Sequence, residues 1–259
     1  MTAFDLSGQV AVITGSSRGI GFAIANLMAT YGATVIISSR KKDACDLAAA
    51  KINAAFDGEE RAVAIAASLS DQDQLAHLIA ETRRRFGRID CLVCNAASNP
   101  YYGPLLKIDD DRFSKIINNN VMANIRLSAM VVPSMRERRS GSIIIISSIG
   151  ALMGSDMIGA YNISKAADLQ LVRNLAVELG DSQITVNAIL PGAIRTDFSK
   201  ALWENNSAAA SLCKRIPLGR IGAPEDIAGA TVFLASSAGR YMTGQSIIID
   251  GGAAIAGLS

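Results

Sequence analysis

The sequence predicts an α/β protein: one domain spanning residues 1–259, built on a doubly wound parallel sheet of seven strands with helices on both faces. Short runs rich in Val and Ile alternate with helical patterns along the chain, which is typical of βαβ units around a parallel sheet buried on both faces. No segment rich in Pro, Gly or Ser divides the chain. With 50% of its 259 residues hydrophobic, the chain can bury one large core.

Seven short runs have the composition of buried strands, because each is rich in β-branched or small apolar residues. They lie at 10–14, 34–38, 62–66, 89–94, 142–147, 185–190 and 246–249. We expect about six helices between them. Apolar residues recur at spacings of three and four in 20–31 and in 71–86, which indicates a helix in each. Residues 195–220 carry no such pattern and are predicted to form a mobile flap over the site.

The composition argues against several function classes. Lys and Arg total 25 against 23 for Asp and Glu, and the resulting charge of +2 is too small to favour nucleic acid or a membrane as a partner. The basic runs at 83–85 and 136–139 are interpreted as solvated helix faces. We expect no signal peptide and no membrane span, and the four cysteines do not suggest a disulfide framework. The expected compartment is the cytoplasm.

Two other features could indicate a metal or redox site, and both are weak. Cys91 and Cys94 have the spacing of such a pair, but they lie in an expected strand. Residues three apart in a strand point to opposite faces, so one metal could hardly bind both thiolates. His77, the single histidine, lies in a helical stretch and is expected at the surface. We therefore predict no metal site.

A glycine-rich turn follows the first expected strand directly and opens the first helix. Gly15 permits the tight turn, Gly19 lets the backbone approach a pyrophosphate, and Gly21 lets the helix pack near the strand. The helix N-terminus then presents free N–H groups and the positive end of its dipole to the anion. This context predicts a Rossmann-type dinucleotide-binding fold, with cofactor contacts from Gly15, Ser17, Arg18, Gly19, Ile20 and Gly21.

The end of the second expected strand indicates which dinucleotide binds. A carboxylate there would accept a hydrogen bond from the ribose 2′-hydroxyl of NAD and would repel a 2′-phosphate. In this chain Ser39 and Arg40 follow the strand, and the first carboxylate comes at Asp43. Arg40, helped by Arg18, can make charge-assisted bonds to the phosphate, so NADP(H) is favoured. The alternative is that Arg40 merely caps a surface turn.

Tyr161 and Lys165 open a helical run, and their four-residue interval places both side chains on one face. A free phenol has a pKa of about 10, too high for a base near neutral pH, and a neighbouring ammonium lowers it. Tyr161 can then take a proton from an alcohol or return one to a carbonyl oxygen. Ser148 follows the fifth expected strand, where open α/β sheets bind their ligands, and its hydroxyl can bond the substrate oxygen.

Together these motifs resemble the short-chain dehydrogenase/reductase family, over essentially the whole chain. Ser148 and Tyr161 have the family's usual interval, Tyr161 and Lys165 form its Tyr-x-x-x-Lys signature, and Asn120 matches its catalytic asparagine. The resemblance implies that Tyr161 is the general acid/base and that Ser148 orients the substrate oxygen. It also implies that Lys165 lowers the pKa of the tyrosine and binds the nicotinamide ribose, and that Asn120 holds a water of a proton relay.

The implied cofactor site extends beyond the glycine turn. The matching residues are Asn95, Ala96, Pro191, Gly192, Ile194 and Thr196, together with Tyr161 and Lys165. Ile194 and Thr196 are expected near the nicotinamide carboxamide. Two residues depart from the family pattern. Ala97 replaces a common glycine, and Ser68 stands where an aspartate often contacts the adenine, which leaves Leu69 for that contact.

The function implied is that of an NADP(H)-dependent oxidoreductase that reduces a ketone or aldehyde to an alcohol, or runs the reverse reaction, with the hydride carried by the cofactor. A 3-oxoacyl-thioester reductase, with Arg126 or Arg215 near a carrier phosphate, is the alternative. A non-catalytic NADP(H)-binding sensor fits less well, because all four catalytic residues are present. An epimerase or dehydratase fits less well too, because little chain follows the seventh strand to form a substrate domain.

Apolar loop residues indicate either a hydrophobic substrate or, equally, core and subunit contacts. They are Tyr101, Tyr102, Met153, Met157, Ile158, Leu202 and Trp203. The resemblance also implies a homotetramer, packed through the long helices that hold Asn120 and Tyr161 and through the C-terminal strand.

Overall fold

The computed structural model describes residues 3–256, and its seven strands form one sheet in the order β3-β2-β1-β4-β5-β6-β7. Every pair of neighbouring strands runs parallel. The predicted fold class is therefore confirmed. The strands are β1 (Val10–Thr14), β2 (Thr34–Ser38), β3 (Ala62–Ala64), β4 (Cys91–Cys94), β5 (Gly141–Ile146), β6 (Ile184–Pro191) and β7 (Ser246–Ile249).

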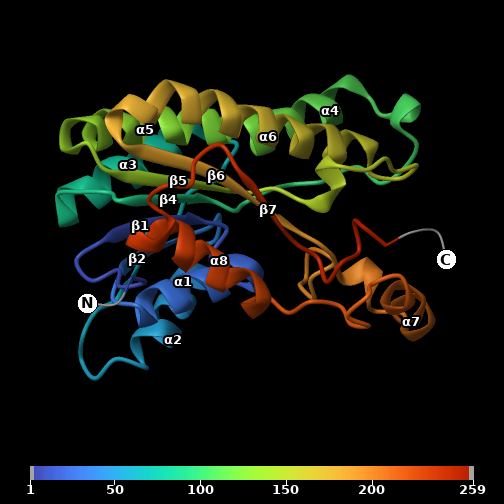
Figure 1. The fold of residues 1–259 in the computed structure, drawn as a ribbon, viewed down its shortest axis with the longest axis horizontal. Coiled ribbons are helices and arrows are strands. Elements are labelled where there is room, and N and C mark those ends of the chain that lie inside the picture. Colours follow the sequence, from blue (N-terminus) through green and yellow to red (C-terminus); the bar gives the residue numbers. More distant parts are fainter. Residues whose placement is uncertain (1–2, 257–259) are drawn as a thin grey trace.

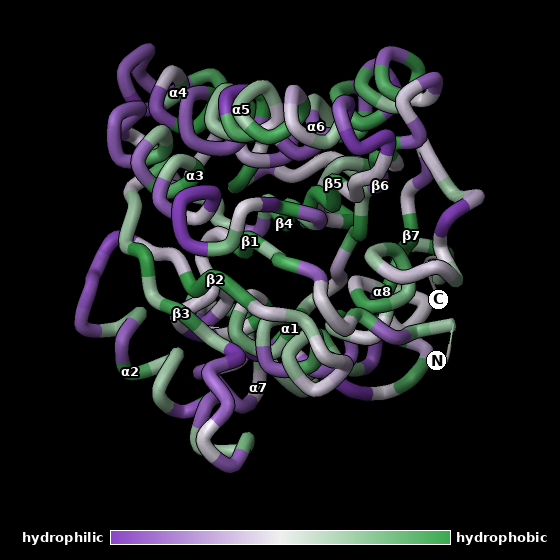
Figure 2. The backbone as a smooth tube through the Cα atoms, turned by 90° about the vertical axis from the view of Figure 1, so that its left-hand side faces the viewer, coloured by the Kyte–Doolittle hydropathy of each residue, from purple (hydrophilic) through white to green (hydrophobic). Residues whose placement is uncertain are grey.

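Two layers of helices cover the sheet, one on each face (Figure 1). One layer holds α1 (Gly19–Thr30), α2 (Lys42–Asn53) and α8 (Glu225–Ala235), and the other holds α3 (Gln72–Phe86), α5 (Ala123–Arg138) and α6 (Gly159–Leu179). Figure 2 shows the hydrophobic strands, in green, between these layers. Successive residues of one strand enter opposite cores: Cys91 packs with the α1 side and Cys94 with the α3 side. The two thiols thus lie on opposite faces, as predicted.

The two helices predicted from apolar spacing are confirmed within a residue at each end, as α1 and α3. Asp71 caps α3, because its carboxylate accepts hydrogen bonds from the N–H groups of Asp73 and Gln74 at 3.1 and 3.0 Å. Gly87 ends α3 in the left-handed conformation, with φ of 72°. His77 on this helix is exposed, as expected.

Two further helices bring the α-helices of the described chain to eight, more than the six or so expected. They are α4 (Asp110–Ile117) and α7 (Asn206–Lys214), and both lie at the right of Figure 1, beyond the carboxyl ends of the strands. α7 lies inside the predicted flap, and none of its described residues is buried. It is therefore not a core helix, in agreement with the missing apolar pattern. Mobility of this segment stays a prediction.

The first basic run lies at the surface of the described chain, as expected from the sequence. Arg84 and Arg85, from the first basic run, are exposed and form ion pairs with Glu81. Among the helices of residues 3–256, none combines the length and the apolarity needed to cross a bilayer.

Candidate active site

The glycine turn joins β1 to α1 at the carboxyl edge of the sheet, and the loop after β4 holds it in place. Gly15 has φ of 66°, a left-handed conformation that glycine adopts readily. A Cβ on Gly15 would lie 2.9 Å from the Cα of Ala96, so the two segments are in direct contact. Asn95 donates a hydrogen bond from Nδ2 to the carbonyl oxygen of Thr14 at 2.9 Å. Asn95 and Ala96 therefore fix the position of the glycine turn on the loop after β4.

The N-terminus of α1 has the features of an anion site. α1 begins at Gly19, and among the described residues no side chain caps it, which leaves N–H groups of the first turn available. Gly19 has φ of 58°, and a Cβ there would lie 3.3 Å from Cγ2 of Thr196 in the loop after β6. A side chain would fill the space between the turn and that loop. Ser17 and Ile20 beside it are half-buried. The uncapped N–H groups and the positive end of the helix dipole suit the pyrophosphate of a dinucleotide.

The end of β2 places the residues expected near the adenosine. Ser39 is half-buried, Arg40 is exposed, and Leu69 is half-buried against the core on the α3 side. Arg18, which is expected to assist Arg40, donates from Nη1 to Oδ2 of Asp197 at 2.8 Å. Its contact with a 2′-phosphate stays a prediction. In this structure Arg18 bridges the glycine turn and the loop after β6.

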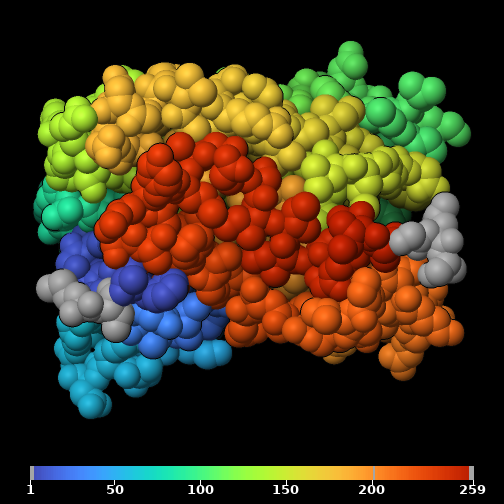
Figure 3. Space-filling view, in the orientation of Figure 1, coloured from blue at the N-terminus to red at the C-terminus, as the bar shows by residue number. Residues whose placement is uncertain are grey.

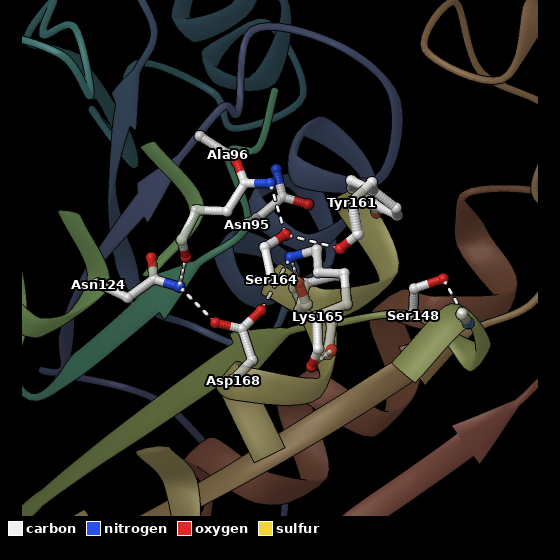
Figure 4. Close-up of polar contacts among 12 residues, drawn as sticks. Asn95, Ala96, Asn124, Ser148, Tyr161, Ser164, Lys165 and Asp168 are labelled. Atoms are coloured by element: carbon white, nitrogen blue, oxygen red, sulfur yellow. Dashed lines mark hydrogen bonds and ion pairs between the residues drawn. The ribbon is translucent and has the colours of Figure 1, made fainter. Parts of the chain in front are cut away.

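Tyr161 and Lys165 lie on the same face of α6, as predicted. The Lys165 side chain is 2% exposed, and its Nζ lies 5.8 Å from the centroid of the Tyr161 ring. Nζ donates hydrogen bonds to the carbonyl oxygen of Ile146 at 2.9 Å and to Oδ2 of Asp168 at 3.0 Å. Figure 4 shows the tyrosine above the lysine, with Asp168 below it. The ammonium is thus held by the end of β5 and by its own helix.

Asn120 lies in a short π-helical turn, η2 (Asn118–Met122), between α4 and α5, and it is fully buried. Three successive asparagines, which are poor helix formers, occupy this turn, and such turns are frequent at functional sites. Oδ1 of Asn120 accepts from the N–H of Ser98 at 2.8 Å, and its Nδ2 donates to Oγ of Ser164 at 3.0 Å. Asn120 therefore ties the loop after β4 to α6. The water relay implied by the resemblance stays a prediction.

Ser148 lies two residues beyond the end of β5, in extended backbone. Its Oγ accepts a hydrogen bond from the N–H of Gly150 at 3.0 Å and caps η3 (Ile149–Ala151). Ser147 beside it donates from Oγ to the carbonyl oxygen of Lys165 at 2.9 Å, which fixes this loop on α6. A serine hydroxyl can donate as well as accept, so Ser148 retains a proton for a substrate oxygen.

Burial raises the pKa of the Tyr161 phenol above its ordinary value. The Lys165 ammonium lowers this pKa, the Asp168 carboxylate raises it, and the Ser148 hydroxyl lowers it. The spacing of Tyr161 and Lys165 predicts a lowered pKa for the phenol, but desolvation of the phenolate outweighs the effect of the ammonium. The protonated phenol is therefore the dominant form near neutral pH, which suits donation of a proton to a carbonyl oxygen.

The loop after β6 starts from a fixed anchor on β7. Pro191 ends β6, and the N–H of Gly192 donates to the carbonyl oxygen of Ile249 at 2.9 Å. Ile194 is 5% exposed and pairs with Gly222 in an isolated parallel bridge. The segment expected to line the nicotinamide is thus held at both ends.

Phe198 lies at the site as well, although it was not predicted from the sequence. Its ring centroid lies 6.0 Å from that of Tyr161, at an interplanar angle of 43°. Trp203, one of the predicted apolar loop residues, donates from Nε1 to the carbonyl oxygen of Thr196 at 3.1 Å and lies against the guanidinium of Arg195. The position of Phe198, two residues after Thr196, was the available signal.

Asp168 was missed as well, although the sequence carries a signal for it. An acidic residue there interrupts the apolar run of α6, three residues after Lys165. Its side chain is fully buried. A carboxylate on the buried face of a helix, one turn from a lysine, predicts an ion pair.

The chain matches a family model described as enoyl-(acyl carrier protein) reductase over residues 15–254. With the parallel sheet, the glycine turn and the Tyr161–Lys165 pair, this match shows that the chain belongs to the short-chain dehydrogenase/reductase family of oxidoreductases.

Individual relatives cover nearly the whole chain. Dehydrogenase/reductase SDR family member 4 of Oryctolagus cuniculus is 39% identical over 248 residues, which span 96% of this chain and 94% of that protein. Among solved structures, a gluconate 5-dehydrogenase from Burkholderia cenocepacia, in complex with NADP and tartrate, has a TM-score of 0.89 and 31% identity over 97% of each chain. A 7α-hydroxysteroid dehydrogenase complexed with NADH and 7-oxo glycochenodeoxycholic acid has a TM-score of 0.92 and 33% identity, over 99% of this chain and 98% of that one.

Proposed function

We propose that this protein is an NADP(H)-dependent oxidoreductase that reduces a ketone or aldehyde to an alcohol, or runs the reverse reaction, with Tyr161 as the general acid/base. The observation that carries the proposal is the Tyr161–Lys165 pair at the carboxyl edge of the sheet, beside Ser148 and the glycine turn. Membership of an oxidoreductase family supports the reaction class.

Three residues of this chain would carry the proton chemistry, and a fourth would position them. In the reductive direction Tyr161 donates its phenolic proton to the substrate oxygen, and Ser148 donates a hydrogen bond to the same oxygen. Bound nicotinamide supplies the hydride. Lys165 stabilises the negative charge left on Tyr161. Asn120 positions this turn of α6, because it binds Ser164, whose hydroxyl donates to the carbonyl oxygen of Tyr161 at 2.7 Å.

NADP(H) is the cofactor that the residues after β2 favour. Arg40 attracts a 2′-phosphate, and Ser39 stands where a carboxylate would repel one. Because the gluconate 5-dehydrogenase is complexed with NADP and the 7α-hydroxysteroid dehydrogenase with NADH, the preference proposed for this chain rests on its own residues after β2. The pyrophosphate would bind the first turn of α1, and Ile194 and Thr196 would lie near the nicotinamide.

The substrate class that fits best is a hydrophobic carbonyl compound. Tyr102 is 65% exposed, Met153 44% and Phe198 59%. The N–H of Gly103 donates to the carbonyl oxygen of Met157 at 2.7 Å, which joins the loop after β4 to the loop after β5. Apolar side chains of these loops thus lie at the end of the sheet that carries Tyr161.

A reductase assay tests this function. The protein is mixed with NADPH and a panel of lipophilic ketones, and loss of dihydronicotinamide absorbance is followed. Tyr161→Phe keeps the ring and removes the acid, so kcat should fall at least about 100-fold. Tyr241→Phe is the matched control, because Tyr241 is fully exposed and should not affect turnover. A Tyr161→Phe enzyme that works at the wild-type rate would refute the assignment, and tight NADPH binding without any turnover would support a non-catalytic sensor.

A 3-oxoacyl-thioester reductase is the second candidate, favoured by the carrier-protein reductase description of the matching family model. Arg215 is exposed at the end of α7, and Arg126 is half-buried on α5. Under this alternative, Arg215→Ala should lower kcat/KM for a carrier-bound 3-oxoacyl thioester and leave kcat/KM for a small ketone unchanged.

We also propose a homotetramer in a reducing compartment such as the cytoplasm, with residues 1–259 as one domain. Exposed apolar side chains on α5, α6 and β7 suit subunit contacts. They are Ile125 at 38%, Ile163 at 42%, Val177 at 88% and Ile248 at 45%. Figure 3 shows the C-terminal segment, in red, open on the outer surface beside α6. All four cysteines are free thiols, in keeping with a reducing compartment. Light scattering of the purified protein measures the assembly mass.

A further inference from the structure

Lys165 and Asp168 form an ion pair inside the protein, below the proposed acid/base Tyr161 (Figure 4). Nζ and Oδ2 are 3.0 Å apart, and the two side chains are 2% and 0% exposed. Burying one charge without a partner is so unfavourable that the group neutralises instead. Each member of this pair therefore depends on the other for its charge.

The hydrogen bonds show which form the carboxylate takes. Oδ2 of Asp168 accepts from Lys165, and Oδ1 accepts from Nδ2 of Asn124 on α5 at 3.1 Å. The same Nδ2 donates to the carbonyl oxygen of Asn120 at 2.6 Å, so the amide is oriented by two acceptors. Burial raises the pKa of Asp168 above its ordinary value, while Lys165 and Asn124 lower it. Because both carboxylate oxygens accept from donors, these contacts favour the ionised form.

The electrostatics of Lys165 depend on this carboxylate. Burial alone lowers the pKa of Lys165, because desolvation disfavours the ammonium, while Asp168 and Tyr161 raise it, and the net direction is upward. The titratable groups that face the pair are Tyr161 on the same helix and Cys94 at the end of β4. Burial raises the pKa of the Cys94 thiol, so Cys94 is neutral. Asp168 thus remains as the anion that offsets desolvation near neutral pH.

We propose that Asp168 is a positioning residue that keeps Lys165 protonated, and so keeps an ammonium available to stabilise the Tyr161 phenolate. The role of Tyr161 rests on the proposed function, whereas the ion pair can be tested in the cofactor-free protein. Without Asp168, the buried lysine would lose its proton within the working pH range, and Tyr161 would lose the cation beside it.

Unfolding equilibria of Asp168→Asn and wild type, measured with denaturant from pH 6 to 10, test the pair directly. In the variant the folded state binds the Lys165 proton more weakly than the unfolded state does, so stability rises with pH relative to wild type. The ratio of the two unfolding constants, variant over wild type, should fall by up to about tenfold per pH unit between the folded-state and the unfolded-state pKa of Lys165. A ratio that is constant or that rises with pH overturns the proposal.

Lys165→Met supplies the converse test, also in cofactor-free protein. Asp168 is then buried without its cation, and it is protonated more readily in the folded than in the unfolded state. The ratio of unfolding constants, variant over wild type, should therefore rise with pH, in a pH range below the one in which Asp168→Asn responds. The Lys165→Met/Asp168→Asn double variant carries neither group and should show a flat ratio. Should Asp168→Asn fail to fold, a flat profile for Lys165→Met overturns the proposal, since coupling is reciprocal.

Kinetics then separate a charge effect from a damaged fold. Asp168→Asn should lower kcat with little change in KM, and the loss should shrink at lower pH, where Lys165 regains its proton. Asp168→Glu keeps a carboxylate and should recover part of kcat. A loss of kcat that is independent of pH would contradict a charge effect. A wild-type protein without turnover would refute the proposed function and leave the unfolding test intact.

Discussion

Gly21 allows a direct test of how closely the glycine turn is fitted to α1. It lies in the first turn of that helix with ordinary helical backbone, so alanine meets no conformational penalty there. An added Cβ would, however, lie 2.5 Å from the carbonyl oxygen of Gly15 and 2.6 Å from Nδ2 of Asn95. These two atoms are hydrogen-bonded to each other at 3.2 Å, so the turn as a whole would have to move.

The structure also supplies the matched control. Overpacking of this kind costs about 1–3 kcal/mol of stability. At the exposed Gly229 in α8, an added Cβ meets nothing within 4 Å, and alanine in a helix is more stable than glycine by about 0.5–1 kcal/mol. The same substitution should therefore act with opposite sign at the two positions. The gap is about 1.5–4 kcal/mol, and each kcal/mol corresponds to roughly 2–4 °C in Tm.

Thermal unfolding of wild type, Gly21→Ala and Gly229→Ala in parallel measures this gap. Because the displaced turn carries the N–H groups proposed to bind the pyrophosphate, NADPH affinity should fall in Gly21→Ala and stay unchanged in Gly229→Ala, as measured by calorimetric titration. Equal stability and equal affinity of the two variants would refute the steric reasoning.

Three further substitutions test other parts of the site and fold. Arg40→Ala should weaken NADPH binding about 10- to 100-fold and spare NADH, because a hydrogen bond to a charged group contributes about 1.5–3 kcal/mol; equal losses in a fluorescence titration would exclude contact with the 2′-phosphate. Phe198→Ala should lower kcat/KM for a lipophilic ketone about 2- to 10-fold through loss of its packing on Tyr161, and an unchanged value would place the substrate elsewhere. Hydrogen bonds from Arg220 and from the N–H of Ala223 lower the pKa of Asp226 to about 2 in the folded protein. The stabilisation of the fold by this carboxylate is therefore fully present above the unfolded-state pKa of 3.8 and is lost as the pH falls toward 2. Asp226→Asn should therefore destabilise by about 1 kcal/mol at neutral pH and progressively less in acid, and a pH-independent difference in denaturant unfolding would contradict this origin.

The strands could be predicted because a parallel sheet buried on both faces leaves continuous apolar runs in the sequence. Their ends could not, since they depend on contacts across the sheet. β4 begins at Cys91 rather than at 89. Just before it, Asp90 bonds to Val10 and Ser142 through its backbone, and its carboxylate also accepts from the N–H of Val10 at 2.9 Å. α7 could not be predicted from apolar spacing, because none of its described residues is buried. Its N-terminus is instead stabilised by the side chain of Asn205, which caps it.

The proton-transfer residues of the candidate site could be predicted since their signals are local: a four-residue interval on a helix for Tyr161 and Lys165, and a strand end for Ser148. The contact of Phe198 with Tyr161 could not be predicted, because it requires the loop after β6 to fold back over α6. The prediction that the pKa of Tyr161 is lowered was wrong for a related reason. The four-residue interval shows that Lys165 is near, but it does not show how deeply the packed molecule buries the phenol.

The position of β7 in the chain has a consequence for biosynthesis. β7 pairs with β6 in the described sheet and follows the other six strands in sequence, and its Ile249 holds Gly192. On the ribosome, the segment proposed to receive the nicotinamide therefore has no anchor until residues 246–249 have emerged. A nascent chain stalled before that point would present the unpaired edge of β6, with its buried apolar residues, to chaperones.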